Sequence, residues 1–313
     1  MSNLSVISLV VKLMTDRTFH RGKWEDRKFR YKFLLRCCCH PLITTHYFRA
    51  LCELSDIDDL LEVNPTLPAK IHRPYLFRNS RTGFRVQAVL DHYHLIRSLP
   101  QEVRRMLNVS RETSLVRTEG KDGRWLDISC SPCGFDREGE LMLILRFNGE
   151  VITRISFTLL YWQGHRMVFV GGLQGPAAGT GTAIIREATR ACYGLFPRRL
   201  LCEALSVVAG MCGAGGIVAV SEDNHVLRQL RYFYQKKGRF VARYSECWKS
   251  AGGKYFDGFW YLPPELPRKD AGEIPARKRA EYRRRNALLD EVRRGLMAAQ
   301  QNGCDFRNTI TLM

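Results

Sequence analysis

The stretch from Met167 to Gly194 constrains the fold most, because it joins a strand, a glycine-rich segment and a helix. Met167–Val170 is apolar and predicts a buried strand, and glycines then recur from Gly171 to Gly181. A helix is expected over Thr182–Tyr193, where apolar residues keep helical spacing and Gly194 follows as a left-handed terminator. A strand, a glycine loop and a helix in this order commonly cradle a phosphate, because free backbone N–H groups point at the anion.

The spacing of the glycines leaves two interpretations open. GGLQGPAAGTG matches neither the G-x-G-x-x-G pattern nor the Walker lysine pattern. The segment therefore predicts either a phosphate or pyrophosphate site or a plain tight connection between a strand and a helix.

Charge and hydrophobic content indicate a folded protein with an anionic partner. Of the 313 residues, 45% are hydrophobic, which is enough for a substantial core in one large domain or two small ones. Lys and Arg number 49 against 31 Asp and Glu, which gives a net charge of +18. Such an excess favours nucleic acid, an acidic membrane surface or another anionic ligand, without choosing among them.

Two apolar stretches bear on where the chain resides. Leu4–Val11 follows no basic residue and precedes no small-residue cleavage pattern, so it is expected to be the first helix rather than a targeting segment. Leu200–Val220 is long enough for a membrane span, but Gly213, Gly215 and Gly216 divide it into a buried helix and a buried strand. The chain is therefore expected to be cytoplasmic, without a transmembrane span and with its 11 cysteines as free thiols.

Periodicity predicts a helical first third, then a run of strands, then alternating helices and strands. Alternating residues and turn signals, among them Asp136–Gly139, indicate an antiparallel meander that leads into the glycine segment. The other expected helices are Leu51–Leu61, Phe84–Leu99, Gln101–Leu107, Arg199–Met211, a helix from about Asn224 onward, and Ala276–Gln300. The expected strands are Arg124–Ser129, Glu140–Phe147, Ile152–Trp162, Arg166–Val170, Ile217–Ser221 and, after a loop at Tyr244–Trp248, Lys254–Leu262.

These elements predict an α+β fold in which helices flank an antiparallel-to-mixed sheet. Residues 1–110 are expected to form a helical, basic N-terminal region. Residues 111–265 would form the mixed α/β core, and residues 266–313 a basic C-terminal helix and tail.

The cysteine and histidine motifs favour structural roles over metal binding. Cys37–Cys39 are adjacent, so they cannot all bind one ion without strain, and no second half-site has matching spacing. Cys130-x-x-Cys133 is a single C-x-x-C motif followed by a turn, whereas a zinc ribbon needs two. His92 and His94 point to different faces of a helix, and each is expected at the surface or in a groove. No metal site is predicted.

His225 and Glu246 are the candidate catalytic residues. His225 follows the predicted buried strand Ile217–Ser221 and lies beside Glu222 and Asp223, and sites in α/β proteins commonly form at the carboxyl ends of strands. A general base at this position would suit acyl transfer. The alternative is that His225 only caps a helix.

The C-terminal helix is the candidate anion-binding element. Leu288, Leu289, Val292 and Leu296 form a narrow apolar stripe that would dock on the core. The arginines would then face phosphates of a lipid or a nucleic acid, or form a solvated surface without a dedicated ligand. No aromatic platform accompanies them, which disfavours sequence-specific nucleic-acid binding. The predicted anion-binding residues are Arg277, Lys278, Arg283, Arg284 and Arg285.

Several motifs, taken in this order, resemble the VirK/YbjX family of enterobacterial proteins. They are GGLQGP (Gly171–Pro176), CYGLFPRRLL (Cys192–Leu201), CWKSAGG (Cys247–Gly253) with GFWYLP after it, and RKRAEYRRR (Arg277–Arg285). The resemblance covers roughly residues 20–300. It implies a core domain of unknown function and an association with virulence, cell-envelope homeostasis, resistance to antimicrobial peptides and stress responses, and it supplies no catalytic residues.

The order of the elements also resembles the core of the GNAT acyltransferases, in which a Q-x-x-G-x-G stretch after the fourth strand binds the pyrophosphate of acyl-CoA. The resemblance implies an acyl donor, either acyl-CoA or an acyl carrier protein. It also implies four cofactor-binding residues, namely Gln174, Gly175, Gly179 and Gly181. The glycines of this chain fall at offsets that differ from those of the acyltransferase motif. An open cleft beside Gly171–Gly181 would favour an enzyme, and a filled cleft would argue against one.

Three hypotheses for function remain. The first is a VirK-like accessory factor that supports virulence, envelope integrity and resistance to antimicrobial peptides or stress, acting at the inner face of the inner membrane or on an envelope component. The second is a GNAT-like acyltransferase with an envelope or protein substrate. The third is a nucleic-acid-associated stress protein of the DNA damage response.

Overall fold

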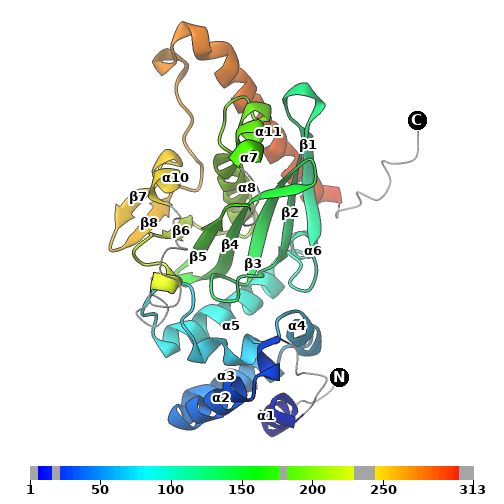
Figure 1. Cartoon of the computed structure of the whole chain (residues 1–313), viewed down its shortest axis with the longest axis vertical. Helices are drawn as coiled ribbons and strands as arrows, with labels where there is room; N and C mark the ends of the chain where they lie inside the picture. Colours follow the sequence, from blue (N-terminus) through cyan, green and yellow to red (C-terminus); the bar gives the residue numbers. More distant parts are fainter. Residues whose placement is uncertain (1–5, 16–21, 177–181, 229–243, 303–313) are drawn as a thin grey trace, which may run out of the picture.

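An eight-stranded sheet in the order β1-β2-β3-β4-β5-β6-β8-β7 forms the centre of the molecule (Figure 1). The structure is a computed structural model that describes residues 6–15, 22–176, 182–228 and 244–302. The strands are β1 (Thr113–Glu119), β2 (Trp125–Pro132), β3 (Leu141–Phe147), β4 (Glu150–Trp162), β5 (His165–Gln174), β6 (Ile217–Val220), β7 (Lys254–Phe256) and β8 (Phe259–Leu262). The predicted α+β class is confirmed.

Strand directions divide the sheet into a meander and a smaller mixed part. β1 to β5 pair antiparallel in chain order, whereas β6 runs parallel to β5, with Val168 opposite Ile217. β8 pairs antiparallel with β6 and with the edge strand β7. The sheet is therefore mostly antiparallel, with one parallel pair between β5 and β6.

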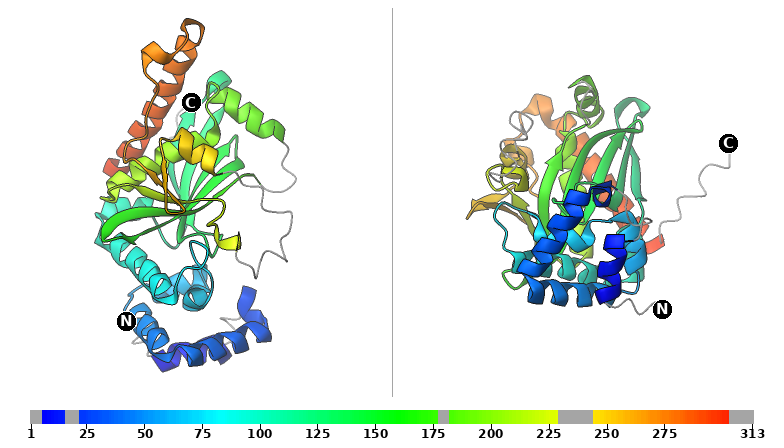
Figure 2. Two further views of the ribbon diagram at one scale, coloured as in Figure 1. Left: turned by 90° about the vertical axis from the view of Figure 1, so that its left-hand side faces the viewer. Right: turned by 60° about the horizontal axis from the view of Figure 1, so that its bottom comes forward.

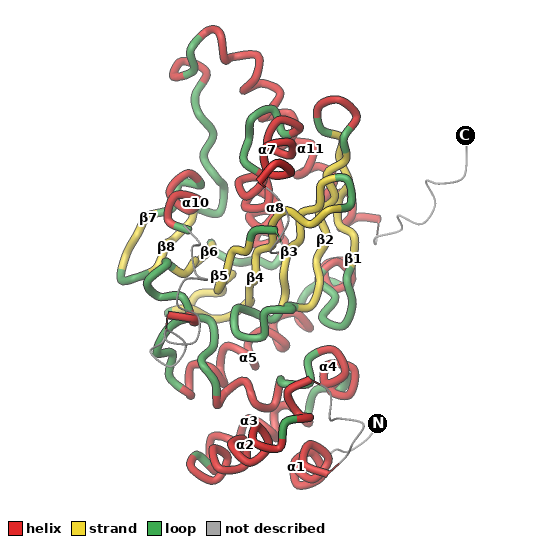
Figure 3. The backbone as a smooth tube through the Cα atoms, in the orientation of Figure 1, coloured by secondary structure: helices red, strands yellow, loops and turns green. Residues whose placement is uncertain are grey.

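Helices lie on both faces of the sheet, as the red and yellow segments of Figure 3 show. The described α-helices are α1 (Val6–Thr15), α2 (Arg27–Cys39), α3 (Pro41–Cys52), α4 (Ile57–Val63), α5 (Thr82–Ser98), α6 (Gln101–Met106), α7 (Thr182–Ala191), α8 (Pro197–Met211), α10 (Ser245–Ser250) and α11 (Arg279–Asn302). Figures 1 and 2 place α1–α5 at one end of the molecule and α7, α8 and α11 at the other.

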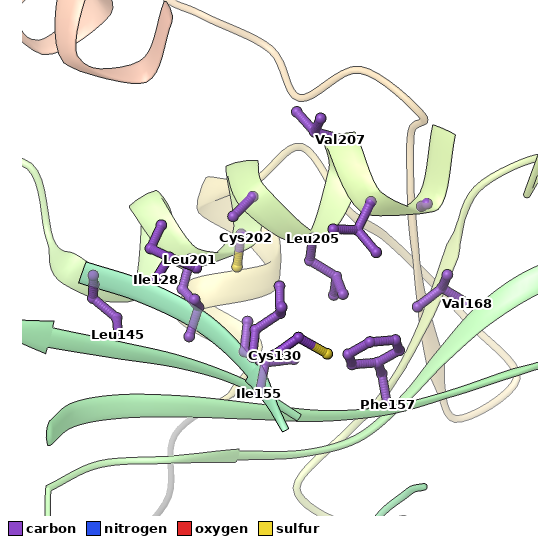
Figure 4. Close-up of a cluster of buried hydrophobic side chains, with 14 of the residues drawn as sticks. Ile128, Cys130, Leu145, Ile155, Phe157, Val168, Leu201, Cys202, Leu205 and Val207 are labelled. Carbon is purple, nitrogen blue, oxygen red and sulfur yellow. The ribbon is translucent and has the colours of Figure 1, made fainter. Parts of the chain in front are cut away.

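Two hydrophobic cores lie on the two faces of the sheet, and successive residues of one strand contribute to different cores. In β4, Leu159 joins the core formed with α6, α8 and α11, whereas Leu160 joins the core formed with α1–α5. In β5, Val168 joins the first of these cores and Phe169 joins the second. Side chains alternate across a strand, so one sheet serves both cores. Figure 4 shows the first core, where Leu205 of α8 points toward the strands.

Several local expectations are wrong. β1 was not predicted, and β5 continues through the glycines, so the break expected at Gly171 is not there. The loop expected at Tyr244–Trp248 is largely helix α10. The strand expected over Lys254–Leu262 is the hairpin of β7 and β8, which turns at Asp257 and Gly258 with positive φ of 46° and 82°. A turn with two left-handed residues reverses the chain tightly, and period-two alternation alone cannot reveal it.

Other expectations hold only in part. Leu200–Val220 divides into α8 and β6, and among the described residues no helix is both long and apolar enough to cross a membrane. The helix expected over Leu51–Leu61 is divided between α3 and α4. No α-helix begins at Asn224 as expected, because His225 forms an isolated bridge with Phe77 and only Val226–Arg228 form a short 3-10 turn. The rest of that expected helix lies outside the described residues. The division of the chain at residues 110 and 265 stays a prediction.

A buried ion pair fixes the N-terminal region on the sheet. Nζ of Lys70 lies 2.6 Å from Oε1 of Glu140, and both side chains are almost fully buried. The hydroxyls of Tyr75 and Tyr93 donate to the same carboxylate at 2.6 and 2.8 Å. A buried charge is stable only when its partners are in place, so this carboxylate couples the packing of α5 to the start of β3.

Helix α5 also completes the hydrogen bonding of β4 beyond the end of β3. The N–H of Leu159 donates to Nδ1 of His92 at 3.1 Å, and the N–H of Tyr161 donates to a carboxylate oxygen of Asp91 at 3.0 Å. These bonds satisfy backbone groups that have no partner in β3, whose pairing stops earlier along β4. His92 is fully buried, so the surface or groove position expected for it is wrong, whereas His94 is exposed.

Acidification is expected to destabilise the fold through His92. Burial, with a smaller contribution from Lys70, lowers the pKa of His92 to about 3. An unfolded chain would protonate this histidine below about pH 6.5, so the unfolded state gains the proton first and stability falls from there downward. Denaturant unfolding at about pH 7 and about pH 5 should show a loss of about 2 kcal/mol from this group. A His92→Gln variant keeps a neutral acceptor and should lose that part of the pH dependence; an unchanged profile would contradict the assignment.

Candidate functional site

The turn between β2 and β3 carries a buried carboxylate that gathers two of the predicted site residues. Glu138 is only 4% exposed. Its Oε2 accepts a hydrogen bond from Nε2 of Gln174 at 2.8 Å, and its Oε1 lies 3.4 Å from Nε2 of the fully buried His225. The structure therefore brings Gln174 and His225 together on Glu138, a residue predicted only as part of a turn.

The paired glycines of β5 make room for Glu138. A Cβ atom on Gly171 would overlap the carbonyl oxygen of Glu138, and a Cβ atom on Gly172 would overlap its Oε2. The register between β4 and β5 shifts at the same place. These two glycines therefore serve close packing inside a strand. Gly179 and Gly181, which were predicted to bind a cofactor, lie outside the described residues.

Buried aromatic side chains fill the space where β5 and β6 part. The parallel register ends at Val170, and Tyr244 and Trp248 are both fully buried. Nε1 of Trp248 donates to the carbonyl oxygen of Val220, the last residue of β6, at 3.1 Å. The hydroxyl of Tyr244 lies beside the backbone of Leu173 in β5, and burial raises the pKa of this hydroxyl. Tyr244 and Trp248 therefore fill the space beside the end of β6, whereas an open hollow remains beside Gly175 and Pro176.

An open hollow of about 630 Å³, which we call the basic hollow, lies beyond this filled region. The end of β5, α7, the start of α8, α10 and the first half of α11 enclose it. Its charged lining residues are Arg198, Arg199, Arg268, Lys269, Arg285 and Glu246. Its apolar lining includes Ile152, Ile185, Leu195, Phe196 and Leu289.

Some cations that line the basic hollow are already paired with carboxylates of the chain, and others are not. Arg199 pairs with Glu203 at 3.0 Å, and Arg268 pairs with Asp290 at 2.8 Å. Arg285 pairs with a carboxylate of its own helix. Within the described part of the chain, the remaining two basic lining residues have no carboxylate at ion-pair distance. These two cations, which are available to a ligand, are Arg198 and Lys269.

The start of α8 adds positive potential to the basic hollow. Pro197 is the first residue of α8, and Arg198 follows it in the lining. The first turn of a helix carries a partial positive charge. Here that charge acts without a row of free N–H groups, because Pro197 has no N–H and the N–H of Arg199 donates to the carbonyl oxygen of Phe196 at 2.8 Å. Phe196, immediately before the helix, is 69% exposed. The hollow therefore suits a ligand that has both an anionic group and an apolar part.

Three of the predicted site residues line the basic hollow, namely Gly175, Glu246 and Arg285. Arg285 also has a structural part, because its Nε donates to the carbonyl oxygen of Tyr193 at 2.6 Å and its guanidinium pairs with Glu281. The bond to Tyr193 holds α11 against the turn after α7, whereas the pair with Glu281 lies within α11.

The other predicted anion-binding residues lie along the outer side of α11 and the turn before it. Arg277 and Arg284 line a second hollow of about 640 Å³, which α7 and the turn before β2 also border. Lys278 and Arg283 are exposed. The basic segment thus extends from the basic hollow to the second hollow, and its role in anion binding stays a prediction.

Two thiols meet at the wall of the basic hollow. Sγ of Cys247, which lines the hollow, lies 3.8 Å from Sγ of Cys202 on α8. The hydrogen bond with Cys202 lowers the pKa of Cys247 against the effect of burial, and the charge of Arg198 assists. The same bond, together with burial, raises the pKa of Cys202. Sequence spacing shows no sign of this pair, because 45 residues separate the two cysteines.

The cysteine motifs singled out in the sequence lie elsewhere. Cys37–Cys39 form the end of α2, Cys130 is buried in β2, and Cys133 follows that strand. Among the residues that the structure describes, no three His, Cys, Asp or Glu side chains are grouped so that they could hold a metal ion.

The chain matches a known family over most of its length. The profile of a family described as "Protein of unknown function (DUF535)" covers residues 22–298. The chain belongs to this family. Its segments that resemble the VirK/YbjX proteins, including the glycines beside Glu138 and the start of α8, all lie within the matched residues.

Relatives extend this assignment. The chain is 36% identical to the uncharacterized protein YbjX of Escherichia coli strain K12, over 93% of this chain and 89% of that protein. An uncharacterized protein of Haemophilus influenzae is 26% identical over 46% of this chain and 47% of its own length. No solved structure matches. Membership of the DUF535 family is therefore shown by sequence, and the site must be interpreted from its own chemistry.

Replacing Gly171 with alanine should destabilise the fold. The added Cβ would overlap the backbone oxygen of Glu138, which cannot move without disturbing the hydrogen bond to Gln174 and the contact with His225. Denaturant unfolding should show a loss of about 1–3 kcal/mol in the free energy of unfolding.

Gly210→Ala is the matched control for this substitution. Gly210 lies in α8, and an added Cβ there would have no neighbouring atom within 4 Å. Alanine should stabilise this helix position by roughly 0.5–1 kcal/mol. A Gly171→Ala chain as stable as the unsubstituted one would show that Glu138 does not require a glycine here.

Proposed function

We propose that the chain binds an anionic amphiphile, such as a phosphate-bearing lipid, in the basic hollow, and that it serves through this ligand as a VirK-like accessory factor of the bacterial cell envelope. The observation that carries the proposal is the meeting of Arg198, Lys269 and the positive end of α8 with the exposed ring of Phe196. Phosphate accepts charge-assisted hydrogen bonds from guanidinium and ammonium groups. An acyl chain gains free energy by leaving water for the apolar lining.

A ligand of this class is found at membrane surfaces, so the proposal includes a peripheral position at the inner face of the inner membrane. The net charge of +18 would favour approach to anionic lipid. The exposed Lys278 and Arg283 would add to this attraction. A contribution to virulence, envelope integrity and resistance to antimicrobial peptides or stress would follow, because cationic peptides act on the same anionic lipids.

Removing the two available cations should weaken ligand binding. In a chain with Arg198→Ala and Lys269→Ala, the affinity for monomeric lysophosphatidylglycerol should fall by on the order of tenfold or more, since one charge-assisted contact contributes about 1.5–3 kcal/mol. Isothermal titration calorimetry measures the change directly.

The matched control carries Lys278→Ala and Arg283→Ala, which remove the same charges from outside the hollow. Its affinity for the monomeric lipid should stay close to that of the unsubstituted chain, while its salt-sensitive adsorption to phosphatidylglycerol vesicles should weaken. Absence of binding by the unsubstituted chain, or an equal loss of affinity in both variants, would overturn binding in the hollow.

A GNAT-like acyltransferase is the second candidate function. The parallel pair of β5 and β6 and the carboxylate of Glu246 at the hollow support it. The acyl donor would be acyl-CoA or an acyl carrier protein. Glu246 would then be the general base, because Glu138 holds both Gln174 and His225 in the filled region.

This second candidate predicts consumption of an acyl donor. Release of CoA from acetyl-CoA or palmitoyl-CoA, followed by chromatography, should fall roughly 10²–10⁴-fold in a Glu246→Gln variant that unfolds normally. His225→Ala should instead lower the free energy of unfolding. If neither acetyl-CoA nor palmitoyl-CoA releases CoA, the acyltransferase hypothesis is contradicted.

The nucleic-acid hypothesis has a separate test. It would be favoured if the chain binds DNA with an affinity that falls steeply as the salt concentration rises.

A further inference from the structure

The two sulfur atoms at the wall of the basic hollow differ in their access to solvent. Cys247 is half-buried, lines the hollow and lies in the short helix α10. Cys202 is 1% exposed and lies one helical turn after Arg198 in α8. Their separation of 3.8 Å is a contact distance, so only a small movement of either side chain is needed to join them.

We propose that Cys202 and Cys247 form a redox pair, in which a peroxide that enters the basic hollow oxidises Cys247 and Cys202 then closes a disulfide between α8 and α10. Cys247 is the thiol that solvent reaches, and Cys202 is the shielded thiol behind it. This division of roles is typical of a peroxide-sensing cysteine and its resolving partner. The proposal does not depend on which ligand occupies the hollow.

The reaction balances with hydrogen peroxide as the oxidant. The Cys247 thiolate attacks one peroxide oxygen, the O–O bond breaks, and the departing hydroxide takes up the thiol proton to give water, leaving a sulfenic acid. The sulfur of Cys202 then attacks the sulfenic sulfur, the S–O bond breaks, and a second water leaves with the Cys202 proton. In total, two thiols and one peroxide give one disulfide and two waters.

The electrostatic surroundings support this order of attack. The thiolate is the reactive form of cysteine, and the hydrogen bond with Cys202 and the charge of Arg198 favour it at Cys247. Burial raises the pKa of Cys192 and of Cys212 to about 12, so these thiols stay protonated and shielded. The pair at the hollow is therefore expected to react before them.

Mass spectrometry tests the proposal on the full chain. In a background carrying Cys38→Ser and Cys39→Ser, which removes two exposed thiols of α2, a small excess of hydrogen peroxide should lower the intact mass by about 2 Da. Non-reducing peptide mapping should place the new disulfide between Cys202 and Cys247. A disulfide mapped elsewhere, or none after exposure that oxidises free glutathione, would overturn the pair.

Substitutions separate the two roles. Cys202→Ala should leave a sulfenic acid on Cys247 that dimedone traps, whereas Cys247→Ser should abolish both the disulfide and the trapped adduct. Cys133→Ser, which removes a thiol outside the pair, should leave the disulfide unchanged. Dimedone labelling that persists at Cys202 in the Cys247→Ser chain would reverse the assignment. Lipid binding is measured on the reduced chain, in which the disulfide is absent. A failure of the redox pair is therefore distinguishable from a failure of lipid binding in the hollow.

Discussion

The turn between β2 and β3 places three carboxylates where the N-terminal helices, the sheet and His225 come together. Asp136 pairs with Arg73 at 2.5 Å and with Lys23 at 2.9 Å. Burial alone would raise the pKa of Asp136, but the charges of Arg73 and its neighbours hold it well below its usual range. Glu138 and Glu140 are nearly fully buried, and each accepts a hydrogen bond, Glu138 from Gln174 and Glu140 from Tyr75. A buried carboxylate without partners costs several kcal/mol, so these parts of the chain must be assembled together.

The same turn explains where the candidate chemistry lies. Glu138 occupies Gln174 and His225, and the glycines of β5 are packed against it. Tyr244 and Trp248 close the space at the end of β6. Accessible charge next to this region lies in the basic hollow, which is lined by residues of α7, α8, α10 and α11. A helix start, unneutralised cations and a reactive thiol are concentrated there, next to apolar surface.

Periodicity was sufficient for long elements and insufficient for short ones. The helix predicted over Phe84–Leu99 and the strand predicted over Ile152–Trp162 are confirmed within a few residues, because many positions repeat the same pattern. The segment Tyr244–Trp248 is short, so few positions repeat a pattern, and its helix is joined to β6 by the bond from Trp248 to Val220. Glu138 was hidden in an Asp-Arg-Glu-Gly sequence whose composition is typical of an exposed turn.

By itself, the sequence determined the α+β class, the succession of meander and helices, the family and the excess of positive charge, since these depend on local patterns and composition. Only the tertiary structure decided which cations stay unneutralised and which thiols meet. Arg198 is available while Arg199 is paired, although the two are adjacent. Cys202 and Cys247 touch across 45 residues of sequence. Ion pairing and thiol contact act over a few ångströms, and only the packing of helices on the sheet sets those distances.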